Sequence, residues 1–395
     1  PRVEPTGCER PGERFIQWGC AGLAVFPQIE YLSWIEGRPD AVEHDLASSD
    51  LRPATHADGP IPDRLADLPD PSGTPAVDAL VADQYGVSPD EVLLTAGATN
   101  ANALAFAVAA ETDESTPRDG DPGSEREKPP SVLVEKPGYE PMTTTPVGFG
   151  ARVDRFRRPE GVLDAARVEA AVDDRTVLVA LTDRHNPTGR RADRAALERT
   201  AAAATANDAH LLVDEVYAPF TATPTDGAFG GPSIAGTDGV VVTGSLTKFL
   251  GLGDLRIGWL VADPAFVTAA ERVRQHLPSV AHPSTALARR ALHHLDALSA
   301  DRRERIRRNH DRLAAFAADR DAIAGHVHDG ATYALLAHDL LDGDELTERA
   351  LDAGVLVVPG RFFDRPGAVR VSLGRPTSQA TAALDALGAV LDDVD

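Results

Sequence analysis

Cysteine is almost absent from this sequence of 395 residues, in which only Cys8 and Cys20 occur. Their spacing matches no metal-ligand motif, and two residues cannot build a disulfide framework. A reducing compartment is the default for such a chain, so we expect a cytoplasmic protein.

Long apolar runs are also missing. No window approaches the roughly 18 uncharged apolar residues that a transmembrane helix needs. The first residues, PRVEPTGCERPGERF, lack the basic and then apolar layout of a signal peptide. The sequence therefore predicts a soluble chain without a membrane partner.

Positive charge is scarce as well. The 39 Lys and Arg residues face 61 Asp and Glu residues, which gives a net charge of −22. Nucleic acids and anionic membranes require a basic surface, so the composition argues against both as partners. Small molecules, or a second copy of the chain, are the expected partners.

Lysine is the scarcer of the two basic residues. Only Lys128, Lys136 and Lys248 occur, so the other 36 of the 39 are arginine. High acidity with little lysine is typical of adaptation to a salt-rich cytosol, where ions screen the repulsion between carboxylates. Lysine forms Schiff bases with carbonyl compounds when its surroundings lower its pKa. A sheltered lysine in this chain is therefore a candidate catalytic residue.

Strand-like and helix-like patterns of apolar residues alternate along the sequence. Continuous runs of Val and Leu begin near residues 91, 131, 176, 210, 239 and 257, with helical patterns between them. Such runs are typical of strands covered on both faces, as in a mostly parallel sheet. We expect an α/β domain over residues 50–265.

The sequence changes character after residue 265. Long helices rich in Arg and Ala are followed by two or three strands and a closing helix from about residue 377. This pattern predicts a smaller α+β domain over 266–395, to which the N-terminal segment 1–49 is joined. The segment 112–130, rich in Pro, Gly and charge, is expected to be an exposed loop without regular structure.

Lys248 is the best sheltered of the three lysines. It lies in TGSLTKFLGLGDLRIGW, after an apolar strand, and Arg256 in the same stretch offers a guanidinium suited to a phosphate. A lysine after a strand is ordinarily a surface residue. The replacement of lysine almost everywhere else in this chain favours a function for Lys248.

A carboxylate ends another apolar strand. Asp214 closes HLLVD, where burial costs several kcal/mol unless a cation or hydrogen-bond donors meet the carboxylate. A protonated pyridine nitrogen would be such a partner, and so would a neighbouring arginine. Tyr217 lies three residues later, where open α/β sheets place ligand contacts.

Two turns complete the candidate site. RHNPTGR projects Asn186 beyond the strand that begins at 176. In LLTAGATNANALAF, a strand is followed by Gly97 and a helix, whose first N–H groups at Ala98 and Thr99 can bind an anion. Each signal is weak alone.

Seven short motifs together resemble the class I and II aminotransferases, which use pyridoxal 5′-phosphate. They are GAT at 97, PGY at 137, NPTG at 186, DEVY at 214, SLTK at 245, RIGW at 256 and VRVSLG at 369. The resemblance implies the type I fold of these transferases, with a mostly parallel sheet between helices in a large domain, a smaller α+β domain, and a homodimer.

The resemblance also implies roles at the reacting centre. Lys248 would form a Schiff base with the cofactor and then move the proton between the substrate Cα and the cofactor. Asp214 would keep the pyridine nitrogen protonated. Tyr217 and Asn186 would bind the phenolic oxygen of the ring.

Other residues would hold the rest of the cofactor and the substrate. The resemblance implies ring stacking by Tyr139, a phosphate cup of Gly97, Ala98, Thr99, Ser245 and Arg256, and a grip on the substrate α-carboxylate by Arg370. Without the motif, Arg370 would be interpreted as a surface arginine on a strand.

The sequence departs from the family at three places. The Asn-Pro pair that usually precedes NPTG is replaced in TDRHNPTG, and no Tyr occupies the upstream position that reaches the partner subunit's phosphate. Ser49 and Asp50 stand where a glycine often contacts substrate. These departures concern substrate choice and reaction type.

The expected reaction is transfer of an amino group between an α-amino acid and a 2-oxo acid. The alternative is another reaction of the same cofactor, namely decarboxylation or elimination of a β or sulfur substituent. A non-catalytic sensor of pyridoxal phosphate is a remote alternative, because such sensors carry a basic DNA-binding module and the N-terminal segment here is too short and not basic.

Overall fold

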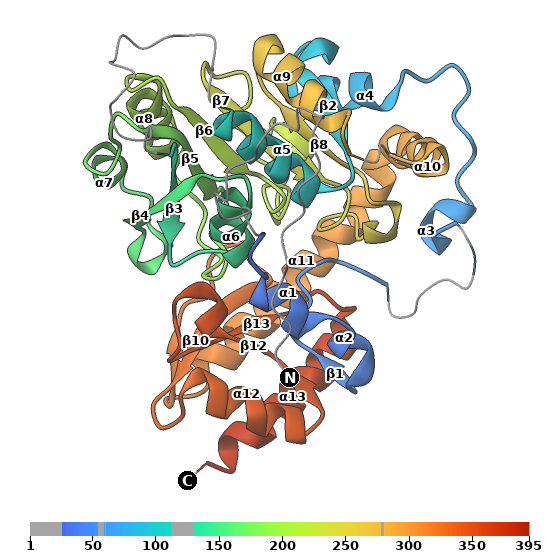
Figure 1. Cartoon of the computed structure of the whole chain (residues 1–395). Coiled ribbons are helices and arrows are strands. Elements are labelled where there is room, and N and C mark those ends of the chain that lie inside the picture. Colours follow the sequence, from blue (N-terminus) through green and yellow to red (C-terminus); the bar gives the residue numbers. More distant parts are fainter. Residues whose placement is uncertain (1–25, 54–58, 60, 112–128, 278–279, 395) are drawn as a thin grey trace, which may run out of the picture.

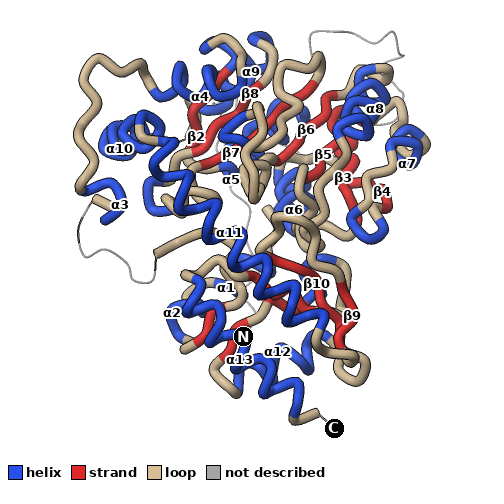
Figure 2. Tube along the Cα trace, turned by 180° about the vertical axis from the view of Figure 1, so that it is seen from behind, coloured by secondary structure: helices blue, strands red, loops and turns tan. Residues whose placement is uncertain are grey.

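The computed structural model describes residues 26–53, 59, 61–111, 129–277 and 280–394. Most of the loop expected over 112–130 lies outside this part of the chain. The described residues form a larger upper part and a smaller lower part, which the long helix α11 (Leu295–Ala318) joins (Figures 1 and 2).

The larger part contains a seven-stranded sheet in the order β2-β8-β7-β6-β5-β3-β4. β8 is antiparallel to both of its neighbours, β2 and β7, and the other six strands all run in the same direction. The strands are β2 (Val92–Thr95), β3 (Ser131–Lys136), β4 (Arg152–Arg157), β5 (Thr176–Thr182), β6 (His210–Asp214), β7 (Val240–Ser245) and β8 (Gly258–Val261). This arrangement confirms the expected α/β fold with a mostly parallel sheet.

Helices cover both faces of this sheet (Figure 1). Along β6, Leu211 and Val213 belong to one hydrophobic core, whereas Leu212 faces the core formed with α5. Burial on both faces explains why the strands are continuously apolar in the sequence. The helices of this part are α3 (Asp63–Ala66), α4 (Val77–Tyr85), α5 (Ala98–Ala110), α6 (Glu140–Gly148), α7 (Ala165–Glu169), α8 (Arg194–Thr205), α9 (Pro264–Arg274) and α10 (His282–His293).

The smaller part is built from the two ends of the chain. Its four-stranded antiparallel sheet has the order β12-β13-β10-β9, and β1 pairs in parallel with β11. The strands are β1 (His44–Asp45), β9 (Ile323–Gly325), β10 (Tyr333–His338), β11 (Val355–Leu356), β12 (Val358–Pro359) and β13 (Val369–Ser372). The remaining helices are α1 (Glu30–Ile35), α2 (Arg38–Ala41), α12 (Gly343–Asp352) and α13 (Thr377–Asp392).

A short segment after β1 passes from the smaller part to the larger one. Leu46 N donates to Leu356 O at 2.9 Å, and Leu51 N donates to Lys248 O at 2.9 Å. Residues 46–51 are buried along their whole length. We call these residues the crossing segment; the domain boundaries expected from the sequence remain a prediction.

No helix in the described part of the chain combines the length and the apolarity needed to cross a bilayer.

Candidate active site

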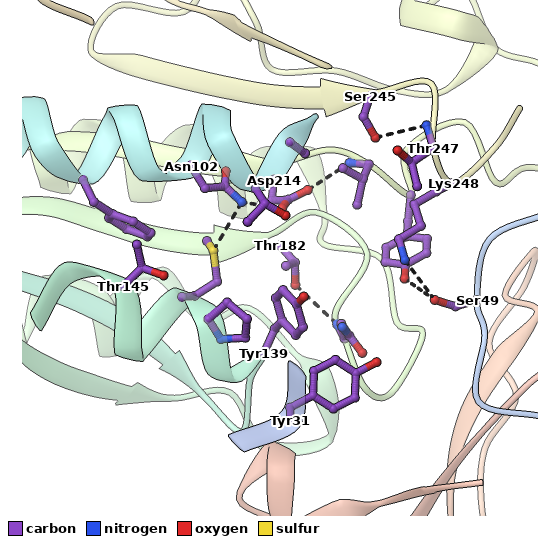
Figure 3. Close-up of a pocket in the computed structure, with 18 of the residues that line it drawn as sticks. Tyr31, Ser49, Asn102, Tyr139, Thr145, Thr182, Asp214, Ser245, Thr247 and Lys248 are labelled. Carbon is purple, nitrogen blue, oxygen red and sulfur yellow. Dashed lines mark hydrogen bonds between the residues drawn. The ribbon is translucent and has the colours of Figure 1, made fainter. Parts of the chain in front are cut away.

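Ten of the eleven predicted site residues line one cavity at the carboxyl ends of the central strands (Figure 3). They are Ala98, Thr99, Tyr139, Asn186, Asp214, Tyr217, Ser245, Lys248, Arg256 and Arg370. Gly97 is the exception; it is the residue directly before α5, whose first two residues Ala98 and Thr99 line the cavity. The sequence motifs, which are scattered over 270 residues, therefore meet at one place.

Lys248 lies in the turn after β7, and its side chain reaches into the cavity. Its Nζ lies 5.7 Å from the centroid of the Tyr217 ring and donates a hydrogen bond to Ser49 Oγ at 3.4 Å. Burial lowers the pKa of the Lys248 amine, but Tyr217 and Asp50 raise it, and the net direction is upward. In the cofactor-free chain the pKa of this amine therefore lies above its ordinary value, because Tyr217 and Asp50 outweigh the effect of burial.

Asp214 ends β6, and its carboxylate is buried in the cavity wall. Asn102 Nδ2 donates to Oδ2 at 2.9 Å, and the backbone N–H of Val216 donates to Oδ1 at 3.1 Å. Thr243 in turn donates to Asn102 Oδ1 at 2.6 Å, which fixes the amide orientation. Burial raises the pKa of the Asp214 carboxyl, and the two hydrogen bonds and Lys248 only partly offset this rise.

The partners of Asp214 bear on the alternative that an arginine neutralises it. Among the described residues, its hydrogen-bond donors are a neutral amide and a backbone N–H. A buried carboxylate without a cationic partner is costly, and it favours binding of a cation in the cavity. Figure 3 shows Asn102 beside Asp214 on one side of the cavity and Lys248 beside Ser49 on the other.

Asn186 and Arg370 meet across the two parts of the molecule. Asn186 follows β5 in the NPTG turn, and Arg370 lies on β13 of the smaller part. Arg370 Nη1 donates to Asn186 Oδ1 at 2.9 Å, and its Nη2 donates to Ala47 O at 2.9 Å and to the Tyr31 hydroxyl at 3.4 Å. Arg370 is only 2% exposed, so the alternative of a surface arginine is wrong.

The opposite end of the cavity offers donors for an anion. Gly97 has φ +83°, and a Cβ there would lie 3.1 Å from Nη2 of Arg256, so the position favours glycine. Arg256 Nη2 donates to Ala96 O at 3.3 Å, beside the first turn of α5. Ser245, at the end of β7, accepts a hydrogen bond from Thr247 N at 3.3 Å. These groups gather guanidinium, hydroxyl and helix N–H donors at one point.

Tyr139 precedes α6 and lines the cavity between the two ends just described. Its ring lies 5.8 Å from the ring of Tyr31, in an edge-to-face arrangement. Burial raises the pKa of the Tyr139 phenol further above its ordinary value, so the ring stays uncharged. A neutral aromatic ring at this place suits packing against another ring.

Some cavity residues were not predicted from the sequence. Tyr31 comes from α1, in the N-terminal region where the resemblance is weakest, and no local pattern singles it out. Asn102 could have been found, because it is a polar residue within the apolar helix ANALAFAVAA. Ser49 was noted only as a departure from the family, yet it contacts both Tyr217 and Lys248.

The unusual TDRH stretch before NPTG supports the turn from behind. Arg184 donates to Gly189 O at 2.7 Å and to Phe220 O at 2.9 Å. His185 contacts Thr188 Oγ1 at 2.8 Å and Pro137 O at 2.9 Å, so it connects the NPTG and PGY turns. This departure from the family therefore concerns the scaffold of the site, since neither residue lines the cavity.

Comparison with known proteins agrees with this geometry. Residues 62–387 match the family model described as aminotransferase class I and II. A histidinol-phosphate aminotransferase of Sphingopyxis alaskensis is 30% identical over 353 residues, which are 86% of this chain and 88% of that protein. The chain belongs to the class I and II aminotransferase family.

Two further known proteins are similar to this chain. The capreomycidine synthase of Streptomyces vinaceus is 31% identical over 65% of this chain and 67% of that protein. The solved structure of a PLP-dependent aminotransferase from Streptococcus suis has a TM-score of 0.75 at 21% identity, covering 94% of this chain and 99% of that one. The likeness in structure confirms the type I transferase fold.

The family membership establishes the broad activity. The chain is an aminotransferase that depends on pyridoxal 5′-phosphate, and its substrates are amino acids and 2-oxo acids.

A test of the Asp214 environment uses the cofactor-free protein. Because the folded pKa of Asp214 lies above its ordinary value of 3.8, the folded state holds this proton more tightly than the unfolded state. Its contribution to stability is therefore fully present below pH 3.8 and is lost as the pH rises through the folded pKa. We expect the free energy of unfolding of Asp214→Asn, minus that of the wild type, to increase over this range in denaturant titrations. A difference that does not change with pH would contradict the analysis.

Proposed function

We propose that this enzyme transfers an amino group between an α-amino acid and a 2-oxo acid, with Lys248 as the residue that binds the cofactor covalently and moves the proton. The observation that carries the proposal is that the Lys248 amine, the Asp214 carboxylate and the Arg370 guanidinium face one cavity. These are an amine, an anion and a cation at separate places, as a cofactor and an α-amino acid together require.

The described residues fit pyridoxal 5′-phosphate. The buried carboxylate of Asp214 suits a protonated ring nitrogen, because its donors are neutral. Ala98, Thr99, Ser245 and Arg256 would hold the phosphate with N–H, hydroxyl and guanidinium groups. When bound, the cofactor withdraws electrons from the substrate Cα, which makes the Cα proton acidic.

Lys248 would act as the base at the substrate Cα. Its amine reaches the cavity from the turn after β7, between Tyr217 and Ser49. A base needs its lone pair free, so the raised pKa of the cofactor-free amine has to fall when the site is loaded. Binding a cation beside Asp214 works in that direction, because positive charge disfavours an ammonium group nearby.

Arg370 would bind the substrate α-carboxylate. Its guanidinium is fixed by Asn186 and Ala47, while its Nε has no hydrogen-bond partner among the described residues. A planar guanidinium can bind a carboxylate through two parallel hydrogen bonds, which also fixes the orientation of Cα toward Lys248.

We infer a homodimer from the resemblance to the family, and the scarcity of cysteine favours the cytoplasm. Sedimentation in concentrated KCl tests the assembly, with an expected mass of twice that of the chain. Full activity in a particle with the mass of a single chain would contradict it.

The position of the covalent bond is directly testable. Borohydride reduction of the loaded enzyme, followed by peptide mapping, is expected to place the cofactor on the peptide that contains Lys248. Lys136→Arg is the matched control and should keep the label, whereas Lys248→Arg should lose it. A label on another lysine would overturn the assignment.

The same preparation distinguishes transfer from its rivals. An amino donor added without an acceptor is expected to release 2-oxo acid in an amount equal to the enzyme and then stop, until a 2-oxo acid is added. Continuous release of CO2, or of ammonia together with pyruvate, would instead support decarboxylation or elimination.

The role of Arg370 is tested by Arg370→Lys. We expect kcat/KM for the amino donor to fall about tenfold to a hundredfold, mainly through KM, because lysine cannot form the paired hydrogen bonds. The control is Arg365→Lys, an arginine 3.7 Å from Glu160 at the surface, which should change kcat/KM little. An unchanged KM in Arg370→Lys would exclude the carboxylate role.

A further inference from the structure

Ser49 lies on the crossing segment, which both parts of the molecule hold in place. The backbone of Leu46 is hydrogen-bonded to strands β11 and β13 of the smaller part. Leu51 N donates a hydrogen bond to the backbone oxygen of Lys248 in the larger part. Gly374 approaches so closely that a Cβ there would lie 2.4 Å from Asp50 O and 2.5 Å from Ser48 O. The backbone at Ser49 therefore has little freedom to move relative to Lys248.

The hydroxyl of Ser49 contacts two groups of the proposed reacting centre. Its Oγ lies 2.6 Å from the Tyr217 hydroxyl and accepts a hydrogen bond from Lys248 Nζ at 3.4 Å. Ser49 is only 3% exposed, so solvent has little access with which to replace either contact. Figure 3 shows Ser49 beside Lys248, with the end of the Lys248 side chain directed toward it.

The direction of these hydrogen bonds follows from what each group can donate. An ammonium or amine N–H of Lys248 donates to Ser49, so the Ser49 proton is free to be donated to the Tyr217 oxygen. The phenolic proton of Tyr217 is then free to point into the cavity. In this arrangement a single serine orients both the amine and the phenol.

We propose that Ser49 is a positioning residue that holds the free Lys248 amine against the substrate Cα and directs the Tyr217 proton into the cavity. The inference rests on the proposed function, since it concerns the amine that moves the proton. It goes beyond that function because it assigns a role to a hydroxyl from the N-terminal crossing segment, where the sequence resemblance is weakest.

Charged and titratable groups face Lys248 from several elements. Those that act on it are Asp214 at the end of β6, Tyr217 in the turn that follows, Asp50 on the crossing segment, Tyr31 from α1 and Arg370 from β13, while Arg256 lines the same cavity. Asp50 is itself paired with Arg52, whose Nε lies 2.8 Å from its Oδ2. Ser49 differs from all of these groups because its hydroxyl does not titrate, so its replacement by alanine changes a hydrogen bond without removing a titratable group.

The first experiment exploits the scarcity of lysine. In the cofactor-free full chain, acetic anhydride labelling at a series of pH values reports the fraction of each lysine that is a free amine, with exposed Lys136 as the internal reference. Hydrogen bonding to an ammonium favours its charged form. In Ser49→Ala we expect the pH at which half of Lys248 is labelled to fall by about one unit. At a fixed pH well below that midpoint, this shift corresponds to about tenfold faster labelling of Lys248 than in the wild type.

Matched variants separate this role from packing. Ser49→Thr keeps the hydroxyl and should keep the midpoint of the wild type. Ser49→Cys keeps the size but is a weak acceptor, and should shift the midpoint even if Ser49→Ala fails to fold. Ser48→Ala changes the preceding residue, which does not line the cavity, and should leave the midpoint unchanged.

The second experiment uses the loaded enzyme and a donor deuterated at Cα. If Ser49 positions the amine, Ser49→Ala should lower kcat about tenfold or more with little change in KM, and should increase the isotope effect on kcat, because proton transfer becomes slower. Ser49→Thr should restore both values.

Two results would overturn the inference. One is a Ser49→Ala or Ser49→Cys enzyme in which both the labelling midpoint and the isotope effect equal those of the wild type. The other is a Ser48→Ala enzyme that shifts as much as Ser49→Ala. Either result, with the cofactor still mapped to Lys248, would remove the role of Ser49 and leave the proposed function intact.

Discussion

The site depends on one buried carboxylate. Asp214 ends the central strand β6 with neutral hydrogen-bond donors, so its charge is poorly compensated inside the protein. Without the amide of Asn102, fixed by Thr243, the carboxylate would lose both a donor and its orientation. The surrounding structure thus holds a carboxylate that the two neutral donors and Lys248 stabilise only in part, so binding of a cation beside it is favourable. This is the property expected of a protein built around a pyridinium ring.

Arginine and lysine have different roles in and around the cavity. Nearly all the basic residues of this chain are arginine, which is suited to places where a fixed guanidinium is needed, as in Arg370 and in the support that Arg184 gives to the NPTG turn. Covalent chemistry with a carbonyl requires a group that can lose its proton, which arginine cannot do near neutral pH. Lys248, the one lysine among the described residues that line the cavity, is therefore the basic residue suited to this chemistry.

The sequence was sufficient for the elements whose residues are buried on both faces, and for the motifs. The apolar runs that became β5, β6 and β7 are continuous because helices cover both sides of the sheet. β4 was missed because its sequence, RVDRFR, is mostly polar, as suits a strand at the edge of the sheet. Tyr31 and Ser49 could not be assigned, since only the folding of the N-terminal region across the molecule brings them to the cavity. The direction of the Lys248 pKa shift likewise depends on neighbours that are distant in the sequence.

The hydrogen bond between Arg370 and Asn186 has a consequence for how the enzyme responds to its substrate. It joins the smaller part to the larger part at the place where an α-carboxylate is proposed to bind. The substrate carboxylate does not have to bring the two parts of the molecule together, because the hydrogen bond between Arg370 and Asn186 already joins them. The carboxylate has to share the Arg370 guanidinium with the Asn186 oxygen or displace that oxygen. The affinity for substrate therefore reflects how much more strongly the guanidinium binds the carboxylate than it binds the amide oxygen.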